Sequence, residues 1–343
     1  MGSEKRYVRF AAAIIVGTAG IFLLLSFAGF SGIMEALVEA RKDYFLLALL
    51  TVVLVLLVRN VRWSIYLHKV GYRPKFSTSF FILLAGCFFE NATPARIGEF
   101  FRPVILRFKE NVSVRLTLPT VLVERTLDLG VSFVFALFGI VIMLAQLDPV
   151  IRYTIIIGML VMLVLMVLVL HLPRIFAYIV RLGVRGLKVM GKGGDRSLED
   201  ELVEASGAAG ESVFSLLRSK ETTFYGIIST FIIWLLNGLR LYLVLKSLGL
   251  EISPLYATIV TVFTVLVATA SMIPFGQGSA EFAMSLVLTS LGYPFELSVV
   301  AAVFDKFLAV WLVALIGAVA GSRLGYSKMF SKNEKDSRDP TRG

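Results

Sequence analysis

Two short motifs place proline, glycine and a carboxylate inside runs that are otherwise apolar enough to cross a membrane. The first motif spans residues 92–100 (ATPARIGEF), and the second spans residues 273–282 (IPFGQGSAEF). Proline and glycine interrupt a helix, and a helix that restarts after them exposes backbone N–H groups and the positive end of its dipole. Such a helix end binds phosphate or carboxylate. Both motifs therefore predict an anion-binding backbone at membrane depth.

The first motif supplies side chains that would complete such a site. Thr93 is a good N-cap, and Pro94 suits the first helical position because its missing N–H is not needed there. Arg96 adds a cation with bidentate hydrogen-bonding geometry. Glu99 follows three residues later and is expected to pair with Arg96 or Arg102. We expect Arg96 to contact an anionic ligand.

The second motif offers a tighter backbone and one carboxylate. Gly276 and Gly278 allow close backbone approach, Ser279 is a plausible N-cap, and Glu281 falls in the first helical turn. Glu281 and Glu99 have two interpretations, as structural ion pairs or as substrate ligands. A charge at membrane depth costs at least about 2.5–3.5 kcal/mol, so such residues are usually functional. The presence of two matched copies favours the functional interpretation.

Further charged residues lie at the start of the third full span. Glu124 and Asp128 are four residues apart and share one helical face, and Arg125 lies beside them. Arg125 has two predicted roles, either a structural pair with Glu99 or Asp128, or direct contact with a ligand.

Three charged residues lie in the last two spans, and Arg62 lies in an earlier one. Asp305 and Lys306 are well inside the last span. Arg240 is expected to face the protein interior because of the cost of charge in lipid. Arg62 lies near one end of its span and is expected to extend toward the membrane surface.

The two motifs belong to a longer internal repeat. Arg240 follows Arg62 by 178 residues, and Glu281 follows Glu99 by 182. Arg62 stands nine residues before a glycine, and so does Arg240. Interrupted hydrophobic segments at matching positions in two halves are the best sequence indicator of a transport site.

Composition places the chain among membrane proteins. Mean hydropathy is +0.83, and 57% of the 343 residues are hydrophobic, against roughly 45–50% for a soluble domain. The net charge of +10 does not indicate nucleic acid, because the basic residues are spread between the hydrophobic runs. One cysteine and two histidines exclude a disulfide framework and a Cys/His metal cluster. We expect no cofactor and no metal.

The predicted fold is an all-α polytopic membrane protein with about six full spans and two re-entrant helical hairpins. The spans are residues 8–30, 44–66, 118–145, 151–172, 223–248 and 296–322. Only 14 uncharged residues precede Glu90, fewer than the roughly 20 that a crossing needs, which favours a hairpin. One hairpin then enters from each side of the membrane.

Residues 1–325 are predicted to form one membrane domain. It contains repeat units at residues 44–145 and 223–322, which are related by inverted topology. Lys and Arg concentrate in the loops that this layout places inside the cell, so both termini are predicted to be cytoplasmic at the plasma membrane. The connector 173–222 begins as a basic amphipathic helix on the membrane surface, and residues 326–343 form a disordered tail.

Three motifs resemble a known family. Residues 94–102 (PARIGEFFR), 123–128 (VERTLD) and 274–281 (PFGQGSAE) are similar to the signature of the lysylphosphatidylglycerol synthase/flippase transmembrane family. Ala95 and residues 275–277 depart from the glycines of that signature. The resemblance implies a domain that moves an aminoacylated phospholipid or another amphipathic lipid between leaflets. Members that make lysyl-lipid carry a soluble transferase domain that these residues do not contain, so we expect lipid handling without synthesis.

The leading hypothesis is a lipid flippase whose motif ends hold the head group of an anionic, aminoacylated or polyprenyl-linked lipid. One alternative is an ion-coupled transporter or channel for a small anion. Another is a non-catalytic membrane partner of a lipid-modifying glycosyltransferase. An enzyme is not expected, because no nucleophile with an acid or base partner is evident.

Overall fold

The computed structural model describes residues 38–143 and 212–323, with isolated positions 149, 153, 156, 157 and 160 between them. The described residues form helices and no strand. Three stretches are long and apolar enough to cross a membrane: α3 (Lys42–Lys69), α10 (Lys220–Ser247) and the continuous stretch Phe295–Arg323. The last comprises α13 (Phe295–Lys306), the π-helical η3 (Phe307–Trp311) and α14 (Leu312–Arg323). These three match predicted spans.

A fourth long helix, α6 (Val114–Met143), contains residues 118–143 of the predicted span 118–145. Its 30 residues give a length of about 45 Å at the rise of an α-helix, so α6 is at least as long as the three stretches above. The predicted span 8–30 and the tail 326–343 lie outside the described residues, as do most of the span 151–172 and of the connector 173–222.

A broken helical hairpin lies between each pair of long helices. The first consists of α4 (Phe76–Ala92), the 3-10 helix η1 (Pro94–Phe100) and α5 (Phe101–Glu110). The second consists of α11 (Pro254–Ala270), the short η2 (Pro274–Gly276) and α12 (Ser279–Ser290). Both α4 and α11 have 17 residues, about 26 Å, which is shorter than the roughly 30 Å hydrocarbon core.

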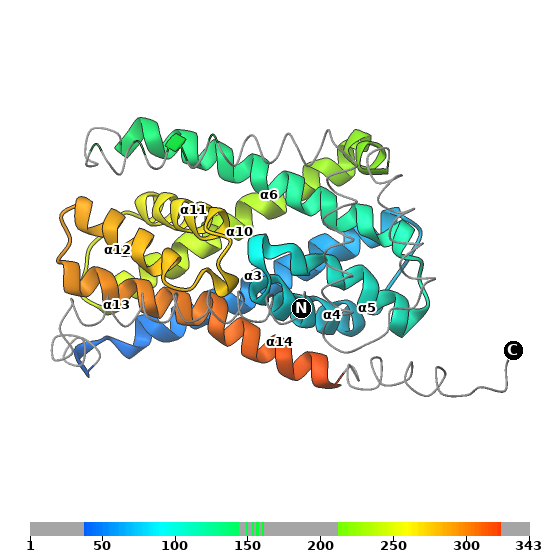
Figure 1. Ribbon diagram of the computed structural model, residues 1–343, viewed down its shortest axis with the longest axis horizontal. Coiled ribbons are helices and arrows are strands. Elements are labelled where there is room, and N and C mark those ends of the chain that lie inside the picture. The colour runs from blue at the N-terminus through cyan, green and yellow to red at the C-terminus, as the bar shows by residue number, and fades with distance from the viewer. Residues whose placement is uncertain are drawn as a thin grey trace, which may run out of the picture.

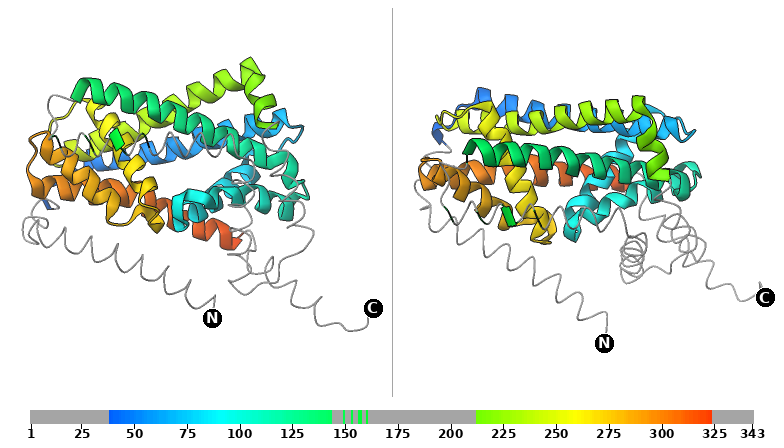
Figure 2. Two further views of the ribbon diagram at one scale, coloured as in Figure 1. Left: turned by 45° about the horizontal axis from the view of Figure 1, so that its top comes forward. Right: turned by 90° about the horizontal axis from the view of Figure 1, so that it is seen from above.

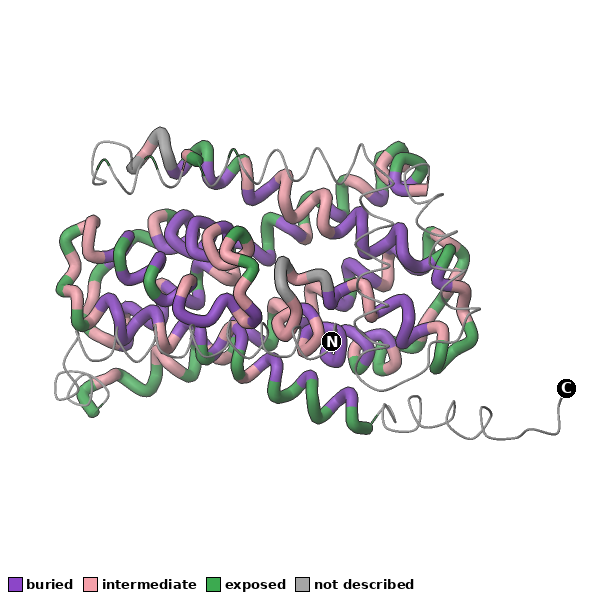
Figure 3. The backbone as a smooth tube through the Cα atoms, viewed as in Figure 1, coloured by how far each residue is buried: buried purple, intermediate pink, exposed green. Residues whose placement is uncertain are grey.

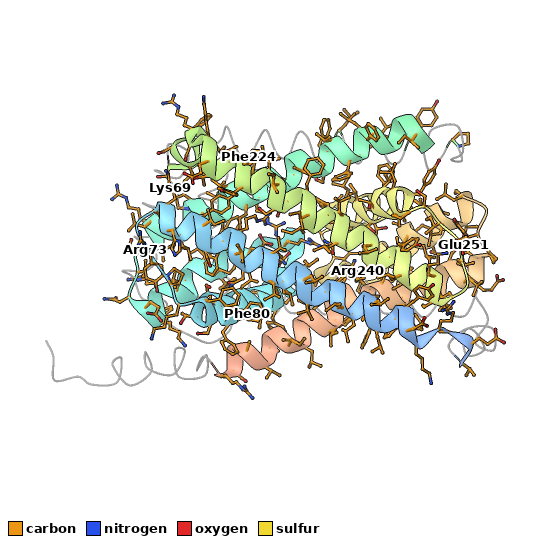
Figure 4. The ribbon with its side chains drawn as sticks, turned by 180° about the vertical axis from the view of Figure 1, so that it is seen from behind. Lys69, Arg73, Phe80, Phe224, Arg240 and Glu251 are labelled. Atoms are coloured by element: carbon orange, nitrogen blue, oxygen red, sulfur yellow. The ribbon has the colours of Figure 1, made fainter. Side chains whose placement is uncertain are left out.

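The two halves of the structure run in opposite directions. Helices α3 and α10 pack side by side and antiparallel, with Lys69 and Arg73 near Phe224 at one end and Glu251 at the other (Figure 4). Helices α6 and α13–α14 also run in opposite directions, and each hairpin occupies one half of the molecule (Figure 1). We call residues 42–143 the first unit and residues 220–323 the second unit.

The bends of the two hairpins meet in the middle of the bundle. We call residues 93–100 the first tip and residues 271–278 the second tip; η1 in the first contacts η2 in the second. Helices α3 and α10 form one outer layer, and parts of both hairpins project at the opposite side (Figure 2).

Small residues allow the helices to pack closely. A Cβ atom built on Gly317 in α14 would lie 2.3 Å from the Leu84 carbonyl oxygen of α4, and one on Gly238 in α10 would lie 2.6 Å from the Thr258 Cα atom of α11. Close approach at small residues is how helices associate in lipid, where hydrophobic burial supplies no driving force. Buried residues run through the interior, most visibly along α11 (Figure 3).

The end of the connector is helical where it is described. Residues 212–218 form a helix, with Val213 and Leu216 buried against Tyr66, Val114 and Leu118. This segment therefore packs onto the ends of α3 and α6.

Candidate functional site

A cavity of about 180 Å³ lies where the two hairpin tips approach the long helices. Its lining contains six cationic side chains: Arg59, Arg62, Arg96, Arg125, Arg240 and Lys306. It contains three anionic ones: Glu90, Asp128 and Asp305. Six against three leaves an excess of three positive charges. Apolar and hydroxyl-bearing residues of α11, including Thr261 and Thr264, complete the wall.

In the first unit, α3 and α6 direct charged side chains toward the hairpin. Glu99 of the first tip is 1% exposed and pairs with Arg125 of α6. Arg59 of α3 donates from Nη2 to Glu90 at 2.8 Å and to Glu99 at 3.2 Å. Of the two roles predicted for Arg125, the structure shows the pair with Glu99, while direct contact with a ligand stays a prediction.

Arg62 joins three helices from a fully enclosed position. Its guanidinium donates to Asp128 at 2.5 and 3.2 Å, to Glu124 at 3.2 Å and to the Thr230 hydroxyl of α10 at 2.7 Å. Arg62 is 2% exposed, so the expectation that it extends toward the membrane surface is wrong. Two acids on α6 hold it inside, because an unpaired charge there would be costly.

Arg102 contacts Glu124 and Glu99 on the side away from the cavity. Its Nη2 donates to Glu124 at 2.7 Å and lies 3.8 Å from Glu99, and its guanidinium stacks over the Trp63 ring. Among the residues that the structure describes, none hydrogen-bonds to the Nε or Nη1 atom of Arg102.

The second unit repeats this arrangement with different residues. Arg240 of α10 donates to Asp305 of α13 at 2.7 and 3.1 Å, and also to the side-chain oxygen of Asn237. Lys306 of α13 lies 3.9 Å from Glu281 and donates to the Gly276 carbonyl oxygen at 3.0 Å. The charged residues of α13 thus link α10 to the second tip.

The pairings correspond between the units. Arg62 with Glu124 matches Arg240 with Asp305, and Arg125 with Glu99 matches Lys306 with Glu281. Other positions differ: Arg59 of the first unit corresponds to Asn237 of the second, 178 residues later, and Asp128 corresponds to Ala309, 181 residues later. The first unit therefore contributes most of the positive charge.

Arg96 is held in an unusual backbone conformation. Its φ of +58° lies in the left-handed region, which costs a residue with a side chain roughly 1–3 kcal/mol. Its guanidinium lies 3.5 Å from Glu90, and the side chain is 29% exposed. Left-handed non-glycine residues also occur in the second tip, at Met272 and Phe275. Strain of this kind concentrates at ligand-binding positions.

The first tip folds back onto the last turn of α4. Gly98 donates its backbone N–H to the Thr93 hydroxyl at 2.6 Å, and a Cβ atom on Gly98 would lie 1.9 Å from the Phe89 carbonyl oxygen. This contact requires glycine and brings Glu99 close to Glu90. The predicted α-helix after Thr93 is instead a 3-10 helix, because the chain must turn sharply here, and α5 begins only at Phe101.

The residue that caps α12 differs from the one predicted from the sequence. Gly278, not Ser279, is the N-cap of α12, and its backbone N–H donates to Glu281 at 2.9 Å. Ser279 hydrogen-bonds to Ser271 and to the Gly276 carbonyl oxygen. Gly276 and Gly278 have φ values of +55° and +79°, in the left-handed region that favours glycine.

Comparison with known sequences identifies the family of the chain. The family described as the lysylphosphatidylglycerol synthase TM region matches residues 10–317. The chain belongs to this family. It is 28% identical to a UPF0104 membrane protein of Methanothermobacter thermautotrophicus over 94% of both chains. A UPF0104 membrane protein of Methanocaldococcus jannaschii is 22% identical, covering 90% of this chain and 92% of the relative. Family and helices together show a multi-pass integral membrane protein.

In this family member, six of the predicted site residues line the cavity: Arg96, Arg125, Asp128, Arg240, Asp305 and Lys306. Glu99, Arg102, Glu124 and Glu281 lie behind them as partners, each at most 2% exposed. Gly276 borders a smaller hollow between the tips that Arg96 and Lys306 also line.

Sequence reasoning did not identify three cavity-lining residues, Arg59, Arg62 and Glu90, as site residues. Arg59 lies three residues before Arg62, on the same face of α3, and this spacing was the available signal. Glu90 had been treated only as the end of an apolar run. Among the described residues, no group of three His, Cys, Asp or Glu side chains is placed to hold a metal ion.

Proposed function

We propose that this protein moves an amphipathic lipid with an anionic head group between the leaflets of the plasma membrane. The observation that carries the proposal is the cavity at the meeting point of the two tips, whose lining has three more cationic than anionic side chains. An excess of one positive charge remains when the partners behind the lining, Arg102, Glu99, Glu124 and Glu281, are counted as well. In a low-dielectric interior that excess attracts an anion strongly, and arginine pairs with phosphate in bidentate geometry. A lipid head group that also carries an ammonium group would bind less favourably in this cavity than a purely anionic one, because the cationic lining repels it.

The proposal includes the topology predicted from sequence. The two units form an inverted repeat, and the hairpins are re-entrant, so each tip lies near the midplane and is reached from a different side. The antiparallel pairing of α3 with α10 and the matching ion pairs support this arrangement. Rocking of one unit against the other would then expose the cavity alternately to each leaflet.

The wall formed by α11 favours a head group that also donates hydrogen bonds. The hydroxyls of Thr261, Thr264 and Thr269 each donate to the carbonyl oxygen four residues earlier, at 2.7–2.9 Å. With their hydrogens already donated, these hydroxyl oxygens can only accept hydrogen bonds from a ligand. A head group with hydroxyls, such as a glycerol or sugar phosphate, supplies the matching donors.

The size of the cavity supports one alternative. At about 180 Å³ it is smaller than the roughly 300–1,000 Å³ of ordinary ligand pockets. It accommodates a head group while the lipid tails stay in the bilayer, or it accommodates a small free anion. An ion-coupled small-anion transporter is therefore the second candidate.

The test is lipid movement in liposomes reconstituted with purified protein. Fluorescent phosphatidylglycerol in the inner leaflet is protected from a membrane-impermeant quencher until it moves. We expect wild-type protein to expose the lipid, and Arg96→Ala, Glu99→Gln and Glu281→Gln to lose most of that movement. Arg73→Ala is the matched control, because Arg73 lies exposed in the loop between α3 and α4.

Full lipid movement by all three variants would reject the proposal. Electrogenic anion flux that does not depend on the lipid would favour the small-anion transporter. Each variant must first give the same monodisperse size-exclusion peak as the wild-type protein, so that a loss of lipid movement is not caused by misfolding.

A further inference from the structure

Glu90 lies at the centre of the positively charged side of the cavity. Its carboxylate is 2.8 Å from Arg59, 3.3 Å from Arg125 and 3.5 Å from Arg96. All four side chains line the cavity. Three arginines from α3, α6 and the first tip therefore converge on one carboxylate, an arrangement that also suits a phosphate.

The position of Glu90 in its helix is unfavourable for a carboxylate. It lies two residues before the end of α4, where the negative end of the helix dipole repels negative charge. The arginines, not the helix, therefore hold the carboxylate in place.

Glu99 provides the contrast. It contacts Arg59, Arg102 and Arg125, but it is 1% exposed and does not line the cavity. Glu99 keeps Arg59 and Arg125 paired from behind when the Glu90 carboxylate is displaced, whereas Arg96 has its ion pair with Glu90 and, among the described residues, none with Glu99. Only Glu90 occupies the side of these arginines that a ligand would approach.

Resting on the proposed function, we propose that Glu90 is an internal substitute for the ligand. The carboxylate occupies the phosphate-binding position in the empty protein, and the phosphate of the head group binds to Arg59, Arg96 and Arg125 by displacing it. The carboxylate returns when the phosphate leaves. This exchange keeps Arg96 from remaining unpaired inside the membrane, and it limits affinity so that the head group can be released.

The exchange also places the phosphate on one side of the cavity. The second unit has Asn237 in place of Arg59, and its Arg240 is already engaged bidentately by Asp305. The phosphate therefore binds on the first-unit side, and the hydroxyl-accepting wall of α11 faces the rest of the head group.

The test is calorimetric titration of detergent-purified protein with racemic glycerol phosphate, with uncharged glycerol as the control probe. Glu90→Gln keeps the size of the side chain and removes the competing charge, so we expect glycerol phosphate to bind at least about tenfold more tightly than to wild type. Glu99→Gln removes the same charge from behind the arginines but does not vacate the position of the ligand, so it should tighten binding clearly less than Glu90→Gln. Arg96→Ala should abolish measurable binding.

Unchanged or weaker binding by Glu90→Gln would overturn the proposal, and so would equal tightening by Glu99→Gln. If Glu90→Gln does not fold, Glu90→Asp shortens the side chain by one methylene and should give a smaller gain in affinity; no gain would overturn it. If wild-type protein moves lipid but Glu90→Gln does not bind glycerol phosphate more tightly, the proposed function stands and the role of Glu90 is rejected. If Glu90→Gln binds glycerol phosphate more tightly but wild-type protein does not move lipid, the displacement by phosphate stands and the proposed function is rejected.

Discussion

The ion pair between Arg240 and Asp305 should act as a buried unit whose halves cannot be removed separately. Both residues are 4% exposed, and two hydrogen bonds of 2.7 and 3.1 Å join them between α10 and α13. Removing one partner of such a pair leaves a buried charge uncompensated and costs about 3–5 kcal/mol. Replacing both with apolar residues of similar volume is often nearly neutral.

We therefore expect Arg240→Met and Asp305→Leu each to lower the unfolding temperature by roughly 6–15 °C, at about 2–3 °C for each kcal/mol. The double variant should be more stable than either single variant. Lipid movement should fall in all three, because both residues line the cavity.

The protein carries its own reporter for this measurement. Cys87 is the only cysteine in the sequence and is 2% exposed, so a maleimide that fluoresces on reaction with a thiol reports its exposure during heating. Arg41→Met is the matched control: Arg41 pairs with Asp43 at 2.9 Å, but both side chains are more than half exposed, and no shift is expected. Two single variants as stable as wild type, or a double variant no better than either single, would refute the reasoning.

Three further predictions follow from the same geometry. Gly98→Ala should lower the unfolding temperature, since overpacking costs about 1–3 kcal/mol, whereas Gly130→Ala, whose Cβ atom would meet no described residue within 4 Å, should raise it slightly. Cys87 in the folded protein should resist maleimide labelling at room temperature, as mass spectrometry would measure; rapid labelling would contradict its burial. Thr264→Val should slow the movement of phosphatidylglycerol more than that of phosphatidic acid in liposomes, because it removes a hydroxyl acceptor; equal slowing would argue against recognition by α11.

Much of the architecture could be predicted because its causes are local. Long apolar runs identify α3, α10 and α13–α14, since roughly 20 apolar residues are needed to span a bilayer wherever they occur. The short run before Glu90 and the proline after it predicted a break, which the structure places at the first tip. The topology of the membrane crossings stays a prediction.

The details of the tips were harder to predict. The 3-10 conformation of η1 and the left-handed Arg96 follow from contacts with α4, chiefly the approach of Gly98 to Phe89. Thr93 and Pro94 indicate only that a helix can start there, and a tertiary contact overrides that preference.

The sequence by itself determined the membrane class, the two interrupted segments and the presence of charges too costly to leave in lipid. Only the tertiary structure decided which charges meet. The ion-paired residues Arg59 and Glu90 are 31 residues apart in the sequence, and the paired residues Arg62 and Glu124 are 62 apart. Each carboxylate had several arginines within plausible reach along the chain, and a Coulomb attraction selects its partner by distance in space, which residue spacing does not encode.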